Sequence, residues 1–443
     1  MPGLPLPKRL RAGRAAMTDG LFSQPLECIQ KKSLPIPPEY IEYFCRPTKI
    51  EDVKIQGTIT LKQGRDHSVK RFHPWVFSGG IERISEDVKD GDWVEVKDAS
   101  NKTLGYGHYQ KGSITLRVVW FGAVPPGDSV YRSKITTAFV VRLHAGVISE
   151  STNAFRLIHG EGDGLPGLIV DVYHDVAIVQ THSIGMHLDR GLISEGIKLA
   201  AEENGFGISA VYYKALFEKS ESEYLLGMAA VPHTVLEHGN KFYVDWEEGQ
   251  KTGFFLDQRE NRKLLGEMSK YKTVLNTFCY TGGFSVYALQ NQASLVHSVD
   301  ASEKAIAMTK RNLSLNGFDP HVHECTVADT FDFIKDKKDV YNLIILDPPA
   351  FAKHKDARHQ AVKGYQRLNA EAMKMIKPGG IIFTFSCSQV VDKQLFYDTI
   401  VSAGIQAGRH IKVLHHLSQP ADHPVSLYHP EGEYLKGLVL YVE

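Results

Sequence analysis

The spacing of apolar and polar positions divides the chain into regions of different character. Between residues 57 and 125, short runs rich in β-branched and aromatic residues alternate with turn sequences such as Asp90-Gly91-Asp92. These runs predict strands at 58–62, 93–97, 104–109 and 114–120. Several short strands joined by tight turns are typical of a small β-barrel or sandwich, which we expect here as a separate domain.

Residues 126–235 combine helical and extended patterns. The segments 131–149 and 186–203 are compatible with helices, whereas 168–173 and 176–181 look like two strands of a hairpin. The segment 160–167 contains four glycines, too many for a regular element, and is expected to form a loop. We expect a central α+β domain.

From residue 236 to residue 443, extended and helical patterns alternate. Strands are predicted at 273–276, 295–300, 340–347 and 380–386, with helical patterns between them, such as 302–316. Regular alternation of strands and helices predicts an α/β fold with a doubly wound, mostly parallel sheet.

Residues 1–56 form an extension without a core pattern, because prolines interrupt every long periodic stretch. The first 16 residues contain Lys8, Arg9, Arg11 and Arg14 and no acidic residue, which is a feature of organelle transit peptides. Translation that begins at Met17 would explain this composition without a targeting signal, and we favour that interpretation. We expect the extension to be poorly ordered.

Composition limits the class of protein. The 443 residues include 51 Lys plus Arg and 51 Asp plus Glu, so any surface that binds a polyanion must be local. No uncharged apolar run reaches the roughly 18 residues that a membrane helix needs, and no membrane association is expected. The five cysteines are scattered, which predicts neither a disulfide framework nor a metal site and favours a cytoplasmic location.

The turn after the first predicted parallel strand is the first candidate site. Its sequence, 276–285, contains Gly282-Gly283, where the backbone can approach a ligand and the next helix presents free N–H groups. Asp300 ends the following strand, eighteen positions after Gly282, where an acid can accept hydrogen bonds from ribose hydroxyls. Neither a complete dinucleotide motif nor a phosphate-binding lysine is present. A nucleoside cofactor without a phosphate chain fits this pattern, and S-adenosylmethionine is such a cofactor.

Two further strand ends carry reactive groups. Asp347 precedes Pro348-Pro349, and two prolines stop the strand and turn the chain outward at the ligand-binding edge of the sheet. Cys387 lies between two serines at the end of the strand 380–386. Asp347 could simply be a turn residue and Cys387 a buried apolar side chain. Because both meet the glycine turn at one edge, we predict that Asp347 and Cys387 are catalytic.

The segment 249–262 opens another helix. Asp257 and Glu260 have the spacing of a capping box. Arg259 would then lie near the cleft, where a guanidinium suits the carboxylate of a ligand. The alternative is an exposed arginine in the first turn.

Basic and aromatic residues are interleaved in the first domain. Lys70, Arg71, His73 and Trp75 are candidates for phosphate contacts and base stacking in RNA. The alternatives are a solvated charged face and, for Trp75, a place in the core of the domain.

Taken together, these motifs resemble the bacterial large-subunit ribosomal RNA cytosine-C5 methyltransferases that carry an N-terminal PUA domain. The resemblance runs from about residue 58 to the C-terminus. It rests on the segments 71–79, 160–167, 251–259, 280–284, 347–349 and 385–388, and on 421–424 with 434–437. Residues 1–56 have no counterpart in it.

The resemblance implies a PUA RNA-binding domain at 57–125, a central domain at 126–235 and a Rossmann-like class I methyltransferase domain at 236–443. It implies that S-adenosylmethionine is held by Arg259, Phe278, Tyr280, Thr281, Gly282, Gly283, Asp300, Asp329 and Asp347. Cys387 would be the nucleophile that adds to C6 of an unpaired or flipped cytosine in large-subunit rRNA, giving 5-methylcytosine. The alternatives are N- or ring-nitrogen methylation of a purine, and a non-catalytic RNA-binding assembly factor. The oligomeric state stays open, with a homodimer as one option.

Overall fold

The computed structural model describes residues 53–443 except 128, 218–219, 336 and 353. The predicted extension therefore lies almost entirely outside the described residues. Within them, no helix combines the length and the apolar character needed to cross a membrane.

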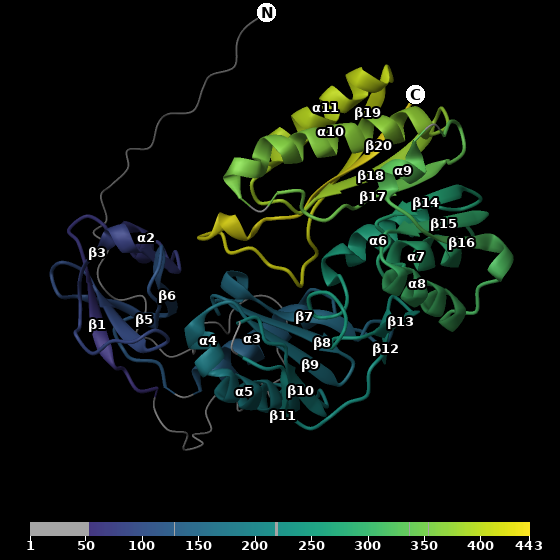
Figure 1. Ribbon diagram of the computed structural model, residues 1–443. Helices are drawn as coiled ribbons and strands as arrows, with labels where there is room; N and C mark the ends of the chain where they lie inside the picture. The colour runs from purple at the N-terminus through teal and green to yellow at the C-terminus, as the bar shows by residue number, and fades with distance from the viewer. Residues whose placement is uncertain (1–52, 128, 218–219, 336, 353) are drawn as a thin grey trace, which may run out of the picture. The chain divides into compact units, whose positions relative to one another are not determined.

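The first domain is built on a six-stranded sheet in the order β2-β6-β5-β4-β1-β3. It lies at the purple end of the ribbon in Figure 1. The elements are β1 (Gly57–Leu61), α2 (His67–Lys70), β2 (Trp75–Phe77), β3 (Ile81–Ile84), β4 (Trp93–Lys97), β5 (Thr103–Tyr109) and β6 (Ile114–Phe121). Alternate residues of these strands, such as Ile59 and Leu61 in β1 and Val94 and Val96 in β4, are buried in one core. In β1 and β4, the period of two therefore places one face of the strand in this core.

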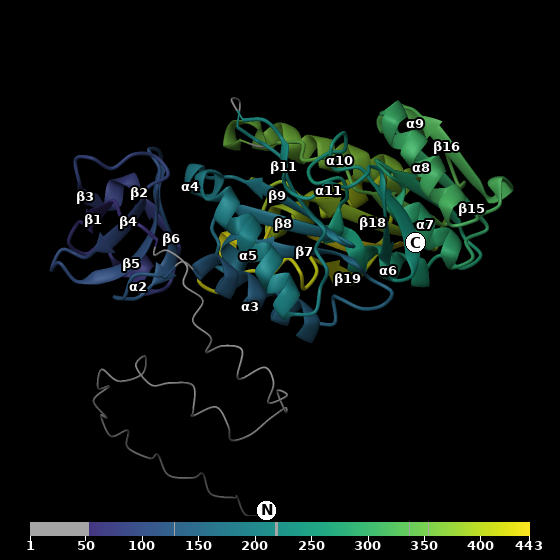
Figure 2. The ribbon, with the colours of Figure 1, turned by 90° about the horizontal axis from the view of Figure 1, so that it is seen from below.

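The central domain has a five-stranded sheet in the order β11-β10-β9-β8-β7. Its elements are α3 (Val130–His144), β7 (Ala154–His159), β8 (Leu168–Tyr173), β9 (Val176–Thr181), α4 (Ile184–Leu188), α5 (Arg190–Glu203), β10 (Ala210–Tyr213) and β11 (Glu223–Leu226). Helices α3 and α5 lie side by side against this sheet (Figure 2).

The single helix predicted at 186–203 is two helices in the structure, separated at Asp189. The Asp189 carboxylate accepts hydrogen bonds from Trp93 Nε1 at 2.8 Å and from the Tyr131 hydroxyl at 2.5 Å, and it lies 3.1 Å from His108 Nε2. These partners come from the first domain and from α3. Tertiary contacts therefore fix the chain at a point where local periodicity alone predicts a continuous helix.

A hairpin links the central domain to the last one. It consists of β12 (His233–Glu237) and β13 (Asn240–Val244), which turn at His238-Gly239. Val235 and Phe242 of the hairpin and the nearby Trp246 are buried in a cluster that also contains residues of β8, β9 and the last sheet. The central and C-terminal domains therefore share one core.

The last domain is a seven-stranded sheet in the order β16-β15-β14-β17-β18-β20-β19. Its elements are α6 (Arg259–Glu267), β14 (Thr273–Thr277), α7 (Gly283–Gln290), β15 (Leu295–Asp300), α8 (Glu303–Leu315), β16 (His323–Val327), α9 (Thr330–Ile334), β17 (Leu343–Leu346), α10 (Arg358–Met375), β18 (Gly380–Ser386), α11 (Lys393–Ala407), β19 (Ile411–Leu417) and β20 (Lys436–Val442). Strands β14 to β18 are parallel, and β20 and β19 close the edge in antiparallel pairings. The predicted doubly wound α/β fold is confirmed.

Helices cover both faces of this sheet, as Figure 1 shows. Leu275 and Ile344 face the cluster that contains α10 and α11, whereas Val274 and Ile345 face the cluster that contains α7 and α8. All four residues of β17 are buried, as expected for a parallel strand packed on both sides. The chain order reverses between β14 and β17, and ligands of such sheets bind outside the carboxyl ends of the strands at this point.

Candidate active site

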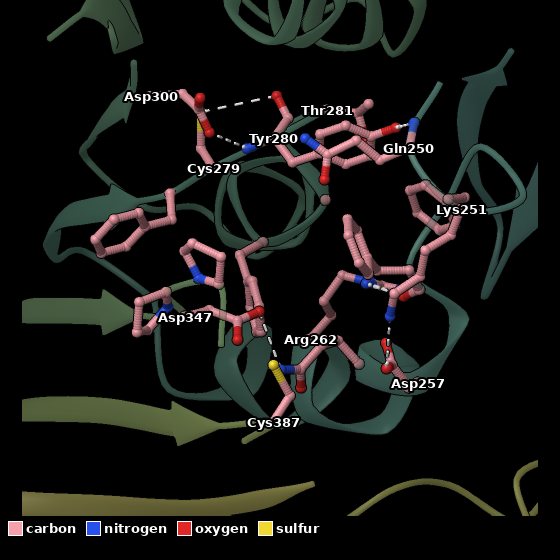
Figure 3. A pocket seen from close by; sticks show the side chains of 18 of the residues that line it. Gln250, Lys251, Asp257, Arg262, Cys279, Tyr280, Thr281, Asp300, Asp347 and Cys387 are labelled. Atoms are coloured by element: carbon pink, nitrogen blue, oxygen red, sulfur yellow. Dashed lines mark hydrogen bonds and ion pairs between the residues drawn. The ribbon is translucent and has the colours of Figure 1, made fainter. Parts of the chain in front are cut away.

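A cavity of about 320 Å³ opens at the carboxyl ends of β14, β15, β17 and β18 (Figure 3). The predicted residues that line it are Phe278, Tyr280, Thr281, Gly283, Asp300, Asp329, Asp347 and Cys387. The parallel topology thus brings together side chains that are more than one hundred positions apart in the sequence. Gly282 belongs to the turn but does not itself line the cavity, and Arg259 does not line it either.

The turn between β14 and α7 has an unusual backbone. Phe278 and Tyr280 have positive φ values of 52° and 48°, and Gly282 has a φ of 79°. Non-glycine residues rarely adopt this region, and such strain is concentrated at functional sites. The Tyr280 N–H donates a hydrogen bond of 2.9 Å to Asp300 Oδ2, which ties the turn to the end of β15.

The glycines of this turn leave no room for side chains. A Cβ atom on Gly282 would lie 2.7 Å from Thr309 Cγ2, and one on Gly283 would lie 2.9 Å from Arg262 Cδ. Close packing on the inner side therefore keeps the backbone of the turn against the cavity. This arrangement lets the start of α7 approach a ligand.

The donor and acceptor groups of the cavity fit a nucleoside cofactor. Asp300 is half-buried, and its Oδ1 accepts a hydrogen bond from the Ser302 N–H at 2.9 Å, which orients the carboxylate at the strand end. Asp329 follows the neighbouring strand and caps α9 by accepting from the Phe331 N–H at 2.8 Å. Two oriented carboxylates at adjacent strand ends can accept hydrogen bonds from ribose hydroxyls and from a base amine.

The loop before α6 forms another wall of the cavity. The Tyr280 hydroxyl accepts from the Gln250 N–H at 3.0 Å and donates to the Gly253 carbonyl at 3.2 Å. Between these residues, Lys251 has a φ of 49° and places its Nζ 3.9 Å from Asp257 Oδ2. The cofactor turn therefore positions a lysine that the sequence alone did not single out.

Asp347 lies at the end of β17 and accepts a hydrogen bond of 3.0 Å from Gln258 Nε2. Burial and the nearby carboxylate of Asp257 raise the pKa of Asp347 to about 7. Asp347 can therefore carry or release a proton at neutral pH, as a general acid or base requires.

Cys387 directly follows β18 and is half-buried, with its side chain directed into the cavity (Figure 3). Burial and Asp347 raise the pKa of its thiol, while the positive charges of Lys251 and Lys436 act in the opposite direction. Lys436 is buried at the start of β20 and donates a hydrogen bond of 2.7 Å to the Ser388 carbonyl. The positive charge of Lys436 thus favours the thiolate form, although the surroundings as a whole raise the pKa of the thiol.

The structure corrects the prediction that Asp257 caps a helix. Helix α6 begins at Arg259, its N-cap is Gln258, and no side chain accepts from the first turn. The Asp257 carboxylate instead lines the cavity and accepts a hydrogen bond of 2.7 Å from the Tyr434 hydroxyl. Tyr434 belongs to the C-terminal segment, which lies too far along the chain for a local pattern to reveal this contact.

Arg259 occupies a different environment from the predicted one. Its side chain is 1% exposed and forms an ion pair of 2.9 Å with Asp422 Oδ2. The guanidinium also donates to the Ala154 carbonyl at 3.3 Å. Arg259 therefore connects α6 to the central domain and to the C-terminal segment, and its charge is already paired.

The four predicted RNA-binding residues differ in their surroundings. Lys70 pairs with Asp66 and with Asp98, whereas Arg71 is exposed. His73 Nε2 lies 3.5 Å from Glu431 Oε1. Trp75 Nε1 donates to Glu161 Oε1 at 2.8 Å, and the indole lines a second cavity of about 210 Å³ together with Arg117 and His182. His73 and Trp75 thus lie where the first domain meets other parts of the chain.

Comparisons with known proteins agree with this geometry. Residues 197–428 match the family of S-adenosylmethionine-dependent methyltransferases, and residues 59–121 match a PUA-like domain. A putative methyltransferase structure titled SMU.776, complexed with SAH, covers 88% of this chain and is itself covered completely, with a TM-score of 0.76 and 23% identity. A putative methyltransferase from Streptococcus mutans gives a TM-score of 0.74 over the same share, with 22% identity. These two structures support the fold.

Curated relatives cover nearly the same part of the chain. Ribosomal RNA large subunit methyltransferase I of Aeromonas hydrophila is 36% identical over 87% of this chain and 99% of its own length. The protein of the same name from Pseudoalteromonas atlantica is 37% identical over 88% of this chain and 100% of its own length. These alignments cover most of the chain. The chain therefore belongs to the S-adenosylmethionine-dependent methyltransferases, in the family of the ribosomal RNA large subunit methyltransferase I proteins.

Proposed function

We propose that this protein methylates large-subunit ribosomal RNA and forms 5-methylcytosine, with Cys387 as the nucleophile. The observation that carries the proposal is the position of the Cys387 thiol in the same cavity as Asp347 and the cofactor turn. The names of the relatives support the RNA substrate. The choice of the C5 atom rests on the thiol, because methylation of a nitrogen needs no covalent adduct.

The chemistry requires temporary activation of the ring. The Cys387 thiolate adds to C6, which forms an S–C6 bond and moves electron density to C5. Asp347 in its protonated form donates a hydrogen bond to N3, or transfers a proton there that returns to Asp347 when the adduct collapses, and so stabilises this adduct. When bound, S-adenosylmethionine would supply an electrophilic methyl group to C5 and leave as S-adenosylhomocysteine. A base then removes the C5 proton, the S–C6 bond breaks, and the thiolate is regenerated.

The side chains of the cavity divide these tasks. Asp300 and Asp329 would hold the nucleoside part of the cofactor, and the turn 278–283 would contact the cofactor through backbone groups. Lys251 and Lys436 favour the thiolate of Cys387 before the base arrives. The first domain holds the flanking RNA, where the exposed Arg71 is suited to contact phosphate.

The experiment that tests the proposal is covalent trapping. A large-subunit rRNA transcript that contains 5-fluorocytidine in place of cytidine cannot lose a proton from C5, so the S–C6 bond should persist as an adduct that survives denaturing electrophoresis. Cys387→Ser should abolish the adduct and lower methylation by about three orders of magnitude or more. The Kd for S-adenosylhomocysteine should stay the same.

The matched control is Cys325→Ser, which changes a half-buried cysteine on β16 outside the cavity lining. This variant should form the adduct as the wild type does. Full methylation by Cys387→Ser would refute the nucleophile assignment. Methylation without any adduct in the wild type would favour transfer to a nitrogen, and neither adduct nor methylation would favour a non-catalytic RNA-binding role.

A further inference from the structure

Asp257 is a buried carboxylate that lines the cavity, and the mechanism above does not use it. Asp257 as a whole is 6% exposed. Oδ2 accepts from the Tyr434 hydroxyl at 2.7 Å and lies 3.9 Å from Lys251 Nζ. Within the described part of the chain, Oδ1 is buried and has no hydrogen-bond partner. A buried acceptor without a donor is costly, so this oxygen marks a place where a ligand N–H group would be stabilising.

Asp257 and Asp347 both line the cavity, and their pKa values are displaced in opposite directions. Burial acts to raise the pKa of Asp257, but Lys251, His423 and the Tyr434 hydroxyl outweigh it and the pKa is lowered. The pKa of Asp347 is raised to about 7, first by burial and then by the negative charge of Asp257. When two neighbouring carboxyl groups are separated in this way, one serves as an acceptor and the other as a donor.

The position of the pair favours the target base as the source of the N–H group. In Figure 3, Asp257 lies on the side of the cavity with Cys387, away from Asp300 and Tyr280. The charge of Asp257 also acts on the Cys387 thiol and on Asp347. The Asp257 carboxylate therefore lines the same side of the cavity as the sulfur that would meet C6 of the pyrimidine.

We propose that Asp257 is a specificity-determining residue, which accepts a hydrogen bond from the exocyclic amine of the target base and so selects cytosine against uracil. Cytosine presents an acceptor at N3 beside a donor at N4, and this edge matches a protonated Asp347 beside an ionised Asp257. Uracil presents a donor at N3 beside an acceptor at O4, which would leave both carboxyl groups mismatched. The inference rests on the proposed function, since it assumes that Cys387 attacks the base.

The test compares two large-subunit rRNA transcripts, one with 5-fluorocytidine in place of cytidine and one with 5-fluorouridine in place of uridine. The wild type should form adducts mainly with the first. Asp257→Asn presents an N–H group where the acceptor was, so the ratio of 5-fluorocytidine to 5-fluorouridine adducts should fall by about tenfold or more. Its melting temperature and its Kd for S-adenosylhomocysteine, compared with those of the wild type, show that the variant is folded and binds the cofactor product.

Tyr434→Phe is the matched control. It removes the internal hydrogen bond to Oδ2 and keeps the carboxylate, so the preference for 5-fluorocytidine should remain. If Asp257→Asn does not fold, the wild type is tested with a transcript that contains 5-fluoro-N4,N4-dimethylcytidine, whose amine has no N–H group. Adduct formation should then drop by a similar factor.

Three outcomes would overturn the inference. The adduct ratio of Asp257→Asn could equal that of the wild type. This variant could lose affinity for S-adenosylhomocysteine with an unchanged ratio, in which case the carboxylate binds the cofactor amine. The wild type could form as much adduct with the dimethylated base as with 5-fluorocytidine. By contrast, a wild type that forms no adduct with 5-fluorocytidine would refute the proposed function itself.

Discussion

At the residue scale, the site depends on charges held in a recess where water screens them poorly. Asp347, Asp257 and Lys436 are all displaced from their ordinary pKa values, and burial acts on each of them. Burial lowers the pKa of Lys436 to about 8. The negative charges near it, including that of the Cys387 thiolate, act in the opposite direction and favour the ammonium form. None of these effects can be calculated from the local sequence, because each depends on partners from other strands and loops.

The raised pKa of Asp347 predicts a pH-dependent stability difference. The folded protein retains this proton up to about pH 7, whereas the unfolded chain releases it near the ordinary aspartate value of 3.8. The stability that wild-type Asp347 contributes is therefore present below pH 4 and is lost as the pH rises to 7. Relative to the wild type, Asp347→Asn should gain about 1 kcal/mol or more between pH 4 and pH 8, or about 2 °C or more in Tm.

Thermal unfolding of both proteins at each pH measures this difference. The stability of the variant minus that of the wild type is taken at each pH. Other groups that titrate in the same way in both proteins then cancel. A constant difference from pH 4 to pH 8 would mean that Asp347 is ionised in the folded protein over the whole range.

At the element scale, the turn between β14 and α7 is the part of the fold whose conformation is most closely tied to its sequence. Gly282 combines a φ of 79° with contact to Thr309, and the turn is bound to β15 through Asp300. The segment was recognisable because two adjacent glycines follow a predicted strand. Its strained residues Phe278 and Tyr280 were not recognisable, since positive φ values in aromatic residues are imposed by the surroundings.

We expect Gly282→Ala to lower cofactor affinity by about tenfold or more and to destabilise the fold. An alanine here must adopt the left-handed region, which costs about 1–2 kcal/mol, and its Cβ would displace Thr309. Gly317→Ala is the control, because Gly317 has a φ of 73° and open space around its Cβ position. Calorimetric titration with S-adenosylhomocysteine should show normal affinity for the control, and equal affinities in the two variants would contradict this role of the turn.

At the scale of the whole molecule, Asp422 joins parts of the chain that are distant in sequence. Its Oδ2 pairs with Arg259 of α6 and accepts the backbone N–H of Arg156 in β7 at 3.0 Å, and its carbonyl accepts from Arg142 of α3 at 2.9 Å. Asp422 is fully buried, and His423 and Arg259 hold the pKa of its carboxyl well below the usual range against the opposing effect of burial. The C-terminal segment is thereby fixed between the central and methyltransferase domains.

Asp422→Asn should destabilise the protein by about 3–5 kcal/mol, because the buried Arg259 guanidinium loses its counter-charge. Glu248→Gln, which removes an exposed ion pair with Lys304, should cost less than about 1 kcal/mol. Chemical denaturation of both variants measures the contrast. If the two variants lost the same stability, Asp422 would not be the link between the domains that its contacts indicate.

The sequence alone determined the order of the domains, the alternation that gives a parallel sheet, and the strand ends that carry Asp300, Asp347 and Cys387. These features are local, since periodicity, prolines and glycines act within a few residues of chain. The tertiary structure alone decided that Asp257 leaves the helix start for the cavity, that Arg259 is bound to Asp422, and that Lys436 lies beside the thiol. Each of these outcomes depends on contacts with the C-terminal segment, which returns to the edge of the sheet. Contacts between residues so far apart in the chain produce no local sequence pattern, so they could not be predicted from the neighbouring residues.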